Sequence, residues 1–138
     1  MKGLTIQEMT VGQSASFAKT ISEADVYQFA GITGDLNPAH INEEYAKNSM
    51  FKGRIAHGML CGSLISAVLG MQLPGPGTIY MKQDLKFLAP VYFGDTLTVV
   101  CTVKELITEK NRAVIECKVT NQDGKDIIAG EALVMPPK

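Results

Sequence analysis

Asp35 and His40 lie five positions apart in the segment 34–40, which reads GDLNPAH. A carboxylate and an imidazole are among the side chains most often used for proton transfer. Asn37-Pro38 between them is a turn signal, because proline fixes its own φ and pushes the preceding residue out of the α region. A helix that reaches this segment must therefore end near Asp35 and re-form after the proline. With a turn between them, the two side chains can converge on one volume and divide proton removal and proton delivery.

The same pair has an ordinary structural interpretation. Asp35 would cap a helix that ends or starts here, and His40 would be a satisfied surface histidine. Helix caps are much commoner than catalytic pairs, so the two residues alone favour this alternative.

A second segment, residues 51–59, reads FKGRIAHGM and opens an uncharged helix. The first amides of a helix have no intrahelical acceptor, and the helix dipole places partial positive charge there. The Gly58 amide is therefore a candidate to stabilise a carbonyl oxygen that gains negative charge, and glycine puts no Cβ in the way. The alternative is that Gly58 only permits close packing of the helix on a sheet.

The longer string around the pair carries a family resemblance. Residues 29–46, FAGITGDLNPAHINEEYA, closely resemble the signature of the MaoC-like (R)-specific enoyl-CoA hydratases, the hydratase 2 family, which has the hotdog fold. One departure is Ala39, where the family usually has a larger aliphatic residue; the change removes no reacting group. The resemblance covers nearly the full length, because it continues through residues 57–59, 80–91, 94–95 and 130–132.

This resemblance implies an enzyme that reversibly adds water to a trans-2-enoyl-CoA, giving the (R)-3-hydroxyacyl-CoA. Asp35 and His40 would form the catalytic dyad, with the roles of acid and base left open, and Gly58 would bind the thioester oxygen. Ser66 and Asn37 would complete the substrate site by orienting the Asp35 carboxylate, although a bond from Ser66 to the backbone is equally reasonable. The resemblance implies no cofactor, no metal, an acyl-CoA thioester as substrate and a homodimer.

Two other functional classes remain open. The first is a hotdog thioesterase, or a dehydratase that acts on a carrier-protein thioester. Thioesterases of this fold usually lack the Asp-x-Asn-Pro-x-His string, which argues against that version. The second is a non-catalytic acyl-CoA-binding module, which has no need of a catalytic dyad.

Other polar residues near the two segments have weaker functional interpretations. We expect His57 to be structural rather than a second catalytic histidine. Arg54 and Lys52 would reach CoA phosphates at a pocket mouth, but a solvated loop is the stronger interpretation. A preference for short acyl chains of four to six carbons is expected, with a tail pocket shaped by Met59, Leu64 and Met71.

The composition bounds the remaining possibilities. At 138 residues and 14.9 kDa, we expect one MaoC-like hotdog domain, 1–138. The formal net charge is −1 and no basic patch occurs, which argues against nucleic-acid binding. The N-terminus lacks the apolar region of a signal peptide, so we expect a cytoplasmic protein. The odd number of cysteines, without metal-ligand spacing, predicts buried small hydrophobes at Cys61, Cys101 and Cys117.

Helices are expected before and after the Asn37-Pro38 turn. Ser22-Glu23-Ala24-Asp25 resembles a capping box that starts a helix running to about Gly34. Asn42 is a suitable N-cap for a short helix over 43–48. Residues 55–81 contain no Asp, Glu, Lys or Arg. We expect them to form a fully buried central helix, apolar all round and ending near Leu73, because about 15 residues are too few for a membrane span of roughly 20.

An antiparallel sheet should surround that helix. Gly58, Gly62, Ser66 and Gly70 recur every four residues, so one stripe of the helix is small and lets another backbone approach. Period-two alternation predicts strands at 82–87, 97–104 and 112–119, after a weaker edge strand at 13–20 and before a last strand at 126–134. Turn signals lie at 109–111 and 121–124. Helices followed by a strand meander indicate an α+β fold, and the resemblance implies a hotdog fold with its sheet wrapped around the long central helix.

Overall fold

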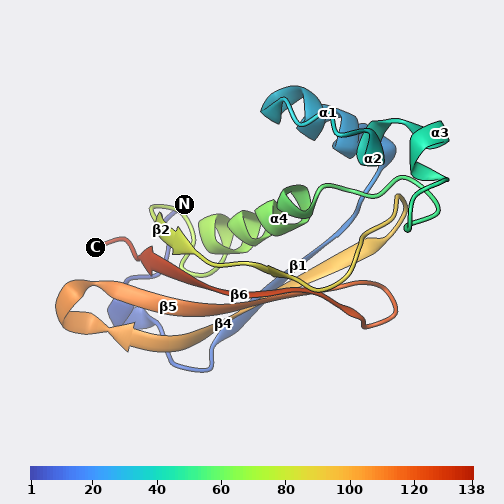
Figure 1. The fold of residues 1–138 in the computed structure, drawn as a ribbon. Coiled ribbons are helices and arrows are strands. Elements are labelled where there is room, and N and C mark those ends of the chain that lie inside the picture. Colours follow the sequence, from blue (N-terminus) through green and yellow to red (C-terminus); the bar gives the residue numbers. More distant parts are fainter.

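In the computed structural model, which describes residues 1–138, a curved antiparallel sheet wraps around one long helix, α4 (Gly58–Met71) (Figure 1). The strands follow the order β1-β4-β5-β6-β2. The short β3 pairs with the same edge of β6 as β2, but nearer to the start of β6. This is the α+β hotdog arrangement predicted from the sequence. The strands are β1 (Ser14–Thr20), β2 (Ile79–Gln83), β3 (Lys86–Phe87), β4 (Thr96–Ile107), β5 (Arg112–Thr120) and β6 (Asp126–Met135).

The alternating patterns of the long strands identify the inner face of the sheet correctly. Every second side chain is buried along β5 and along β4 as far as Val103, and the intervening side chains are more exposed. Cys101 pairs directly with Cys117 across the two strands, and both are fully buried, as is Cys61 on α4. The buried side chains of these two strands are Leu97, Val99, Cys101, Val103, Ala113, Ile115, Cys117 and Val119.

The single strand predicted over 82–87 is divided in two. β2 ends at Gln83 and β3 begins at Lys86, because the chain between them bends close to β6. The N–H of Asp84 donates to the carbonyl oxygen of Glu131 at 3.0 Å. A Cβ on Gly130 would lie 2.0 Å from the carbonyl oxygen of Asp84, so only glycine allows this approach.

The prediction that α4 is fully buried is wrong on one side. The side facing the sheet is buried, but Met59 is 58% and Met71 61% exposed, and Ser63 and Ser66 lie on the same open side. The helix is apolar enough to be buried all round, yet one chain supplies a sheet for only one of its faces. The helix also ends at Met71, two residues before the predicted Leu73. None of the helices combines the length and apolarity that crossing a membrane requires.

The small stripe of α4 is in close contact with the β2–β3 segment. A Cβ on Gly58 would lie 2.8 Å from the Phe87 ring, and one on Gly62 would lie 2.9 Å from the Leu85 side chain. The sequence predicted that another backbone would approach this stripe, but the atoms that approach these two glycines belong to side chains. The close contact does not extend to Gly70, where an added Cβ would have no neighbour within 4 Å.

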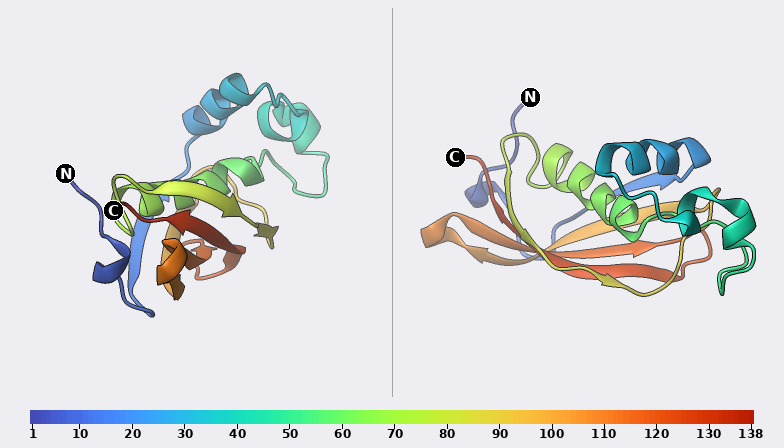
Figure 2. Two further views of the ribbon diagram at one scale, coloured as in Figure 1. Left: turned by 90° about the vertical axis from the view of Figure 1, so that its left-hand side faces the viewer. Right: turned by 45° about the horizontal axis from the view of Figure 1, so that its top comes forward.

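Three further helices form a separate arm over one end of the sheet, named here the helical arm (residues 22–46) (Figure 2). They are α1 (Glu23–Thr33), α2 (Pro38–Ile41) and α3 (Glu43–Ala46). Ser22 caps α1 through a capping box with Asp25, and Gly34 ends α1 with φ 83°. Asn42 caps α3, which stops at Ala46, two residues before the predicted end. A short 3₁₀ turn, Ile6–Glu8, was not predicted.

Candidate active site

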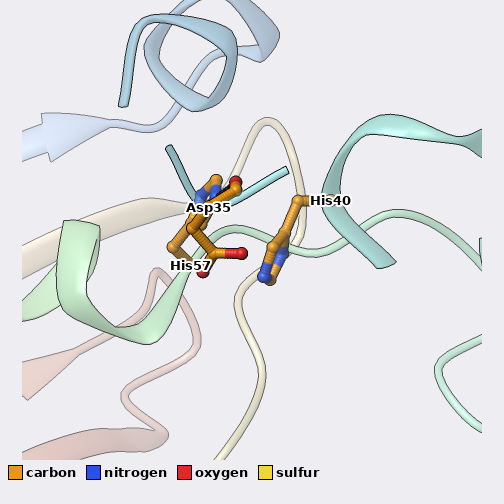
Figure 3. Close-up of side chains that lie close together, drawn as sticks. All are labelled: Asp35, His40 and His57. Atoms are coloured by element: carbon orange, nitrogen blue, oxygen red, sulfur yellow. Dashed lines mark hydrogen bonds between the residues drawn. The ribbon is translucent and has the colours of Figure 1, made fainter. Parts of the chain in front are cut away.

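Asp35, His40 and His57 meet where the helical arm reaches the N-terminus of α4 (Figure 3). Asp35 lies in the turn between α1 and α2, His40 lies on α2, and His57 is the residue that precedes α4. One nitrogen or carboxylate oxygen of each lies within 4.8 Å of the other two. The turn at Asn37-Pro38 thus brings the predicted pair together, and the fold adds a second histidine to it.

The Asp35 carboxylate is held by its own turn and is open to solvent. Its Oδ1 accepts a hydrogen bond from the backbone N–H of Asn37 at 3.1 Å, and its own N–H donates to Thr33 Oγ1 at 3.1 Å. Asp35 is not the N-cap of α2, because the Asn37 side chain has that role and accepts the N–H of Ala39 at 3.1 Å. Asn37 therefore orients the carboxylate through its backbone and not through its side chain.

His40 is buried and bonded, in contrast to the surface histidine of the structural alternative. Its side chain is 9% exposed, and its Nδ1–H donates to the carbonyl oxygen of Ile55 at 2.7 Å. Its ring stacks on that of His57 with centroids 3.9 Å apart and planes 30° apart. These contacts leave Nε2 of His40 as the nitrogen available for chemistry.

His57 links this pair to the start of α4. It is 2% exposed, and its Nε2–H donates to the backbone carbonyl oxygen of Asp35 at 3.0 Å. Gly58 follows as the first residue of α4, so its amide belongs to the unpaired N-terminal end of the helix. The packing role of Gly58 against Phe87 is present as well, and the two roles are compatible.

A groove of about 570 Å³ opens between α4 and the β2–β3 segment. Ser66 lines it but makes no hydrogen bond to Asp35 in this structure. Of the three residues expected to shape a tail pocket, Met59 lines the groove, Leu64 is buried in the core and Met71 lies outside the lining. The apolar walls of the groove are Met59, Tyr80, Met81, Leu85 and Phe87.

Arg54 connects the two ends of the helical arm, a role that sequence reasoning missed. Its guanidinium donates to Glu23 at the start of α1 at 3.0 Å and to Glu43 at the start of α3 at 2.9 Å, and it lies 4.8 Å from the centroid of the Phe93 ring. Burial would lower its pKa, but the hydrogen bonds to both glutamates raise the pKa on balance. One feature of the sequence could have pointed to this role: Arg54 is the last charged residue before the uncharged residues 55–81. Lys52, in the same loop, is exposed and forms no ion pair.

Two imidazoles and one carboxylate are a donor set that transition metals accept. Here the two rings stack, with their planes 30° apart. Each ring also commits one nitrogen to a backbone carbonyl. We therefore interpret the cluster as an acid–base site.

Comparison with known proteins finds similarity to hydratases and dehydratases over nearly the whole chain. The protein-family model described as MaoC like domain matches residues 6–125. The chain is 56% identical over 131 residues to an (R)-specific enoyl-CoA hydratase of Rhodospirillum rubrum, covering 95% of this chain and 90% of that one. It is 46% identical over 138 residues to a 3-hydroxybutyryl-CoA dehydratase of Methylorubrum extorquens, covering 100% and 87%. The unliganded R-hydratase PhaJ1 from Pseudomonas aeruginosa superposes with a TM-score of 0.94 at 46% identity, covering 99% and 87%.

The two ion pairs of Arg54, with Glu23 and Glu43, are called the Arg54 clamp here, and they should stabilise the protein in a pH-dependent way. We expect Arg54→Met to lower Tm by a few degrees at pH 7, because it removes both ion pairs while keeping an aliphatic stem over Phe93. The hydrogen bond from Arg54 lowers the pKa of Glu23 below its ordinary value of 4.5. That contribution is present above pH 4.5 and is lost as the pH falls through the lowered pKa.

Thermal melts of both proteins from pH 7 downward test this prediction. The difference between the two Tm values should narrow in acid, below the lowered pKa of Glu23. It should not vanish, because the hydrogen bond from Arg54 to Tyr27 and the contact with Phe93 do not depend on Glu23. Lys52→Met is the matched control, because it removes a charge from the same loop without breaking an ion pair, and its Tm should equal that of the wild type. Equal Tm values for Arg54→Met and wild type at pH 7 would contradict the clamp.

Proposed function

The chain belongs to the MaoC-like domain family, and on that premise we propose that it is an (R)-specific enoyl-CoA hydratase. The reaction is the reversible addition of water to a trans-2-enoyl-CoA, which gives the (R)-3-hydroxyacyl-CoA. The observation that carries the proposal is the convergence of Asp35 and His40 at the N-terminus of α4. A carboxylate, an imidazole and a helix amide in one place are the groups that this reaction needs.

In the proposed mechanism, Asp35 and His40 bind and activate one water molecule. The free oxygen of the Asp35 carboxylate and the Nε2 of His40 are the atoms available to it. The water oxygen forms a bond to the β-carbon of the enoyl group while a proton is delivered to the α-carbon. The dyad acts as one proton-transfer unit in which the formal base and acid are not distinguished.

The Gly58 amide is the proposed partner of the thioester oxygen. As water adds, this oxygen gains enolate character, and a preorganised amide at a helix N-terminus stabilises the developing charge. Ser66 is the proposed polar contact for the substrate within the groove, and Asn37 supports the site by holding the Asp35 carboxylate through its backbone N–H. These assignments need no metal and no cofactor.

Three alternative functions remain: a carrier-protein dehydratase, a thioesterase and a non-catalytic acyl-CoA-binding module. One relative, 34% identical over 131 residues, is a mitochondrial 3-hydroxyacyl-[acyl-carrier-protein] dehydratase of Solanum lycopersicum. A carrier-protein dehydratase would act poorly on free CoA thioesters, a thioesterase would release a thiol, and a binding module would do neither. A fall in crotonyl-CoA absorbance without thiol release therefore separates the proposed activity from all three.

Three further features are proposed for this protein. They are a single MaoC-like domain over 1–138, a cytoplasmic location and the absence of a nucleic-acid partner. The family match itself extends over residues 6–125.

Substitution of the dyad is the sharpest test of the mechanism. Asp35→Asn and His40→Ala should each lose ~10²–10⁴-fold in kcat on crotonyl-CoA, the usual contribution of a general acid or base. The double mutant should fall well short of the product of the two losses, because the residues act as one unit. The measurement is kcat for each variant together with its Tm.

A cap elsewhere in the helical arm is the matched control. Asp25→Asn weakens the capping box of α1, so it should lower Tm while kcat stays near that of the wild type. Asp35→Asn should show the opposite pattern. A kcat close to that of the wild type in Asp35→Asn or in His40→Ala would contradict the proposed mechanism.

Short acyl chains are the proposed substrates. A 3-hydroxybutyryl-CoA dehydratase among the similar proteins acts, by its name, on a four-carbon chain, and Met59 lines the groove beside α4. We expect a higher kcat/KM for enoyl thioesters of four to six carbons than for a dodecenoyl thioester. A higher kcat/KM for dodecenoyl-CoA than for crotonyl-CoA would contradict this preference.

A homodimer is the proposed assembly. β2 pairs only with β6, so the other edge of β2 has free backbone groups. Beside that edge, the open side of α4 and the strands β2 and β3 expose a run of large apolar side chains, which are Met59, Met71, Ile79, Tyr80, Met81 and Phe87. A second copy related by a two-fold axis would satisfy the edge and close over this surface. Because Met59, Tyr80, Met81 and Phe87 also line the groove, the groove would then lie at the interface between the two copies.

We therefore expect a particle of about twice the 14.9 kDa chain mass by light scattering at micromolar concentration. Met81→Lys, which puts a charge on the exposed surface of β2, should shift the particle toward the monomer. Val100→Lys is the matched control, because Val100 is also exposed but lies on β4, inside the sheet and away from β2. A wild-type monomer with full activity would count against the dimer.

A further inference from the structure

His57 is a buried polar side chain that the proposed mechanism does not use. Its ring lies between those of His40, 3.9 Å away, and Phe29, 4.8 Å away, so that three aromatic rings from three segments are packed together. Its Nδ1 is buried and has no hydrogen-bond partner. A buried polar atom without a partner destabilises a protein, so a histidine here calls for a reason that packing alone does not supply.

The hydrogen bonds of the two histidines define their neutral tautomers. A carbonyl oxygen only accepts hydrogen bonds, so the ring nitrogen that faces it must carry the hydrogen. His57 therefore carries its hydrogen on Nε2, which faces the carbonyl oxygen of Asp35, and His40 carries its hydrogen on Nδ1, which faces that of Ile55. The two stacked rings are thus in opposite tautomers.

This arrangement has a consequence for each member of the dyad. The Nε2–H of His57 holds the backbone of Asp35, the residue whose carboxylate is otherwise fixed only by its own turn. The ring of His57 supports one face of His40 while Ile55 holds its Nδ1, so the bare Nε2 of His40 is kept in one direction. A single side chain therefore contacts both proposed catalytic residues.

We propose that His57 is a positioning residue that holds Asp35 through its Nε2–H and His40 through its ring, and thereby fixes the two histidines in opposite tautomers with Nε2 of His40 left bare. The role in catalysis rests on the proposed hydratase function. The tautomers do not, because they follow from the hydrogen bonds alone.

Nitrogen-15 NMR of the imidazole rings tests the tautomers directly. The chain contains two histidines, so the spectrum holds only the two rings of interest, and His57→Gln assigns them. In alkaline buffer, where imidazole is neutral, we expect the Nε2–H form for His57 and the Nδ1–H form for His40. The same tautomer for both rings, or rapid averaging at either, would overturn the proposal whatever the enzyme's activity.

Two variants separate the two contacts of His57. His57→Gln keeps an N–H donor near the position of Nε2 but removes the ring, and His57→Phe keeps a ring for stacking but removes the donor. Each should lower kcat on crotonyl-CoA by about 10- to 100-fold, as expected for misplaced reacting groups, with KM changed much less. In His57→Gln the remaining His40 resonances should also move, because the stacked ring is gone.

Cys61→Ala is the matched control for loss of stability. Cys61 is buried one turn into α4, its N–H bonds to the carbonyl oxygen of His57, and it belongs to no part of the proposed site. We expect it to lower Tm with kcat almost unchanged. Unchanged kcat in both His57 variants would overturn the positioning role, as would a kcat loss in Cys61→Ala equal to theirs. Absence of hydratase activity in the wild type would instead overturn the proposed function and leave the tautomer test standing.

Discussion

The attachment of the helical arm to the four residues before α4 is the constraint on which the site depends. The arm adds no strand to the sheet, so it is placed by side-chain and loop contacts. Arg54 bonds to the first residues of α1 and α3, Ile55 bonds to the Nδ1–H of His40, and His57 bonds to Asp35. Three of four consecutive residues therefore hold the arm, and the same segment leads directly into α4. The dyad and the helix N-terminus are aligned because one short stretch of chain fixes both.

The environment of α4 explains how polar chemistry is placed beside an apolar core. The helix is buried against β4 and β5 on one side, which anchors it rigidly through hydrophobic packing. Gly58 and Gly62 let the Phe87 and Leu85 side chains lie against the helix backbone on another side. This close contact places the Phe87 and Leu85 side chains in one wall of the groove.

The open side of α4 concerns assembly rather than the core of one chain. A helix of this apolar character is stable when it is covered, yet the sheet of one chain leaves the side with Met59 and Met71 exposed. The free edge of β2 lies beside the same surface. Unsatisfied backbone groups and exposed apolar side chains in one place favour association with a second copy. The composition of the helix therefore bears on assembly as well as on the core.

Much of the fold could be predicted from the sequence, because the signals concerned are local. The capping residues Ser22 and Asn42, the Asn37-Pro38 turn and the alternation within β4 and β5 act over a few residues, and each element they predict is present. The convergence of Asp35 and His40 belongs to this group, because a tight turn needs no distant partner to bring its ends together.

The tertiary structure decided the features that join residues far apart in the chain. His57 stacks on His40 and Arg54 bridges Glu23 and Glu43 only because the arm folds back over the segment before α4. The division between β2 and β3 depends on how closely Asp84 approaches Gly130, and the exposed side of α4 depends on how far one sheet extends. The sequence shows that a residue is apolar or can form hydrogen bonds. Which residue it packs against or bonds to depends on how the whole chain folds.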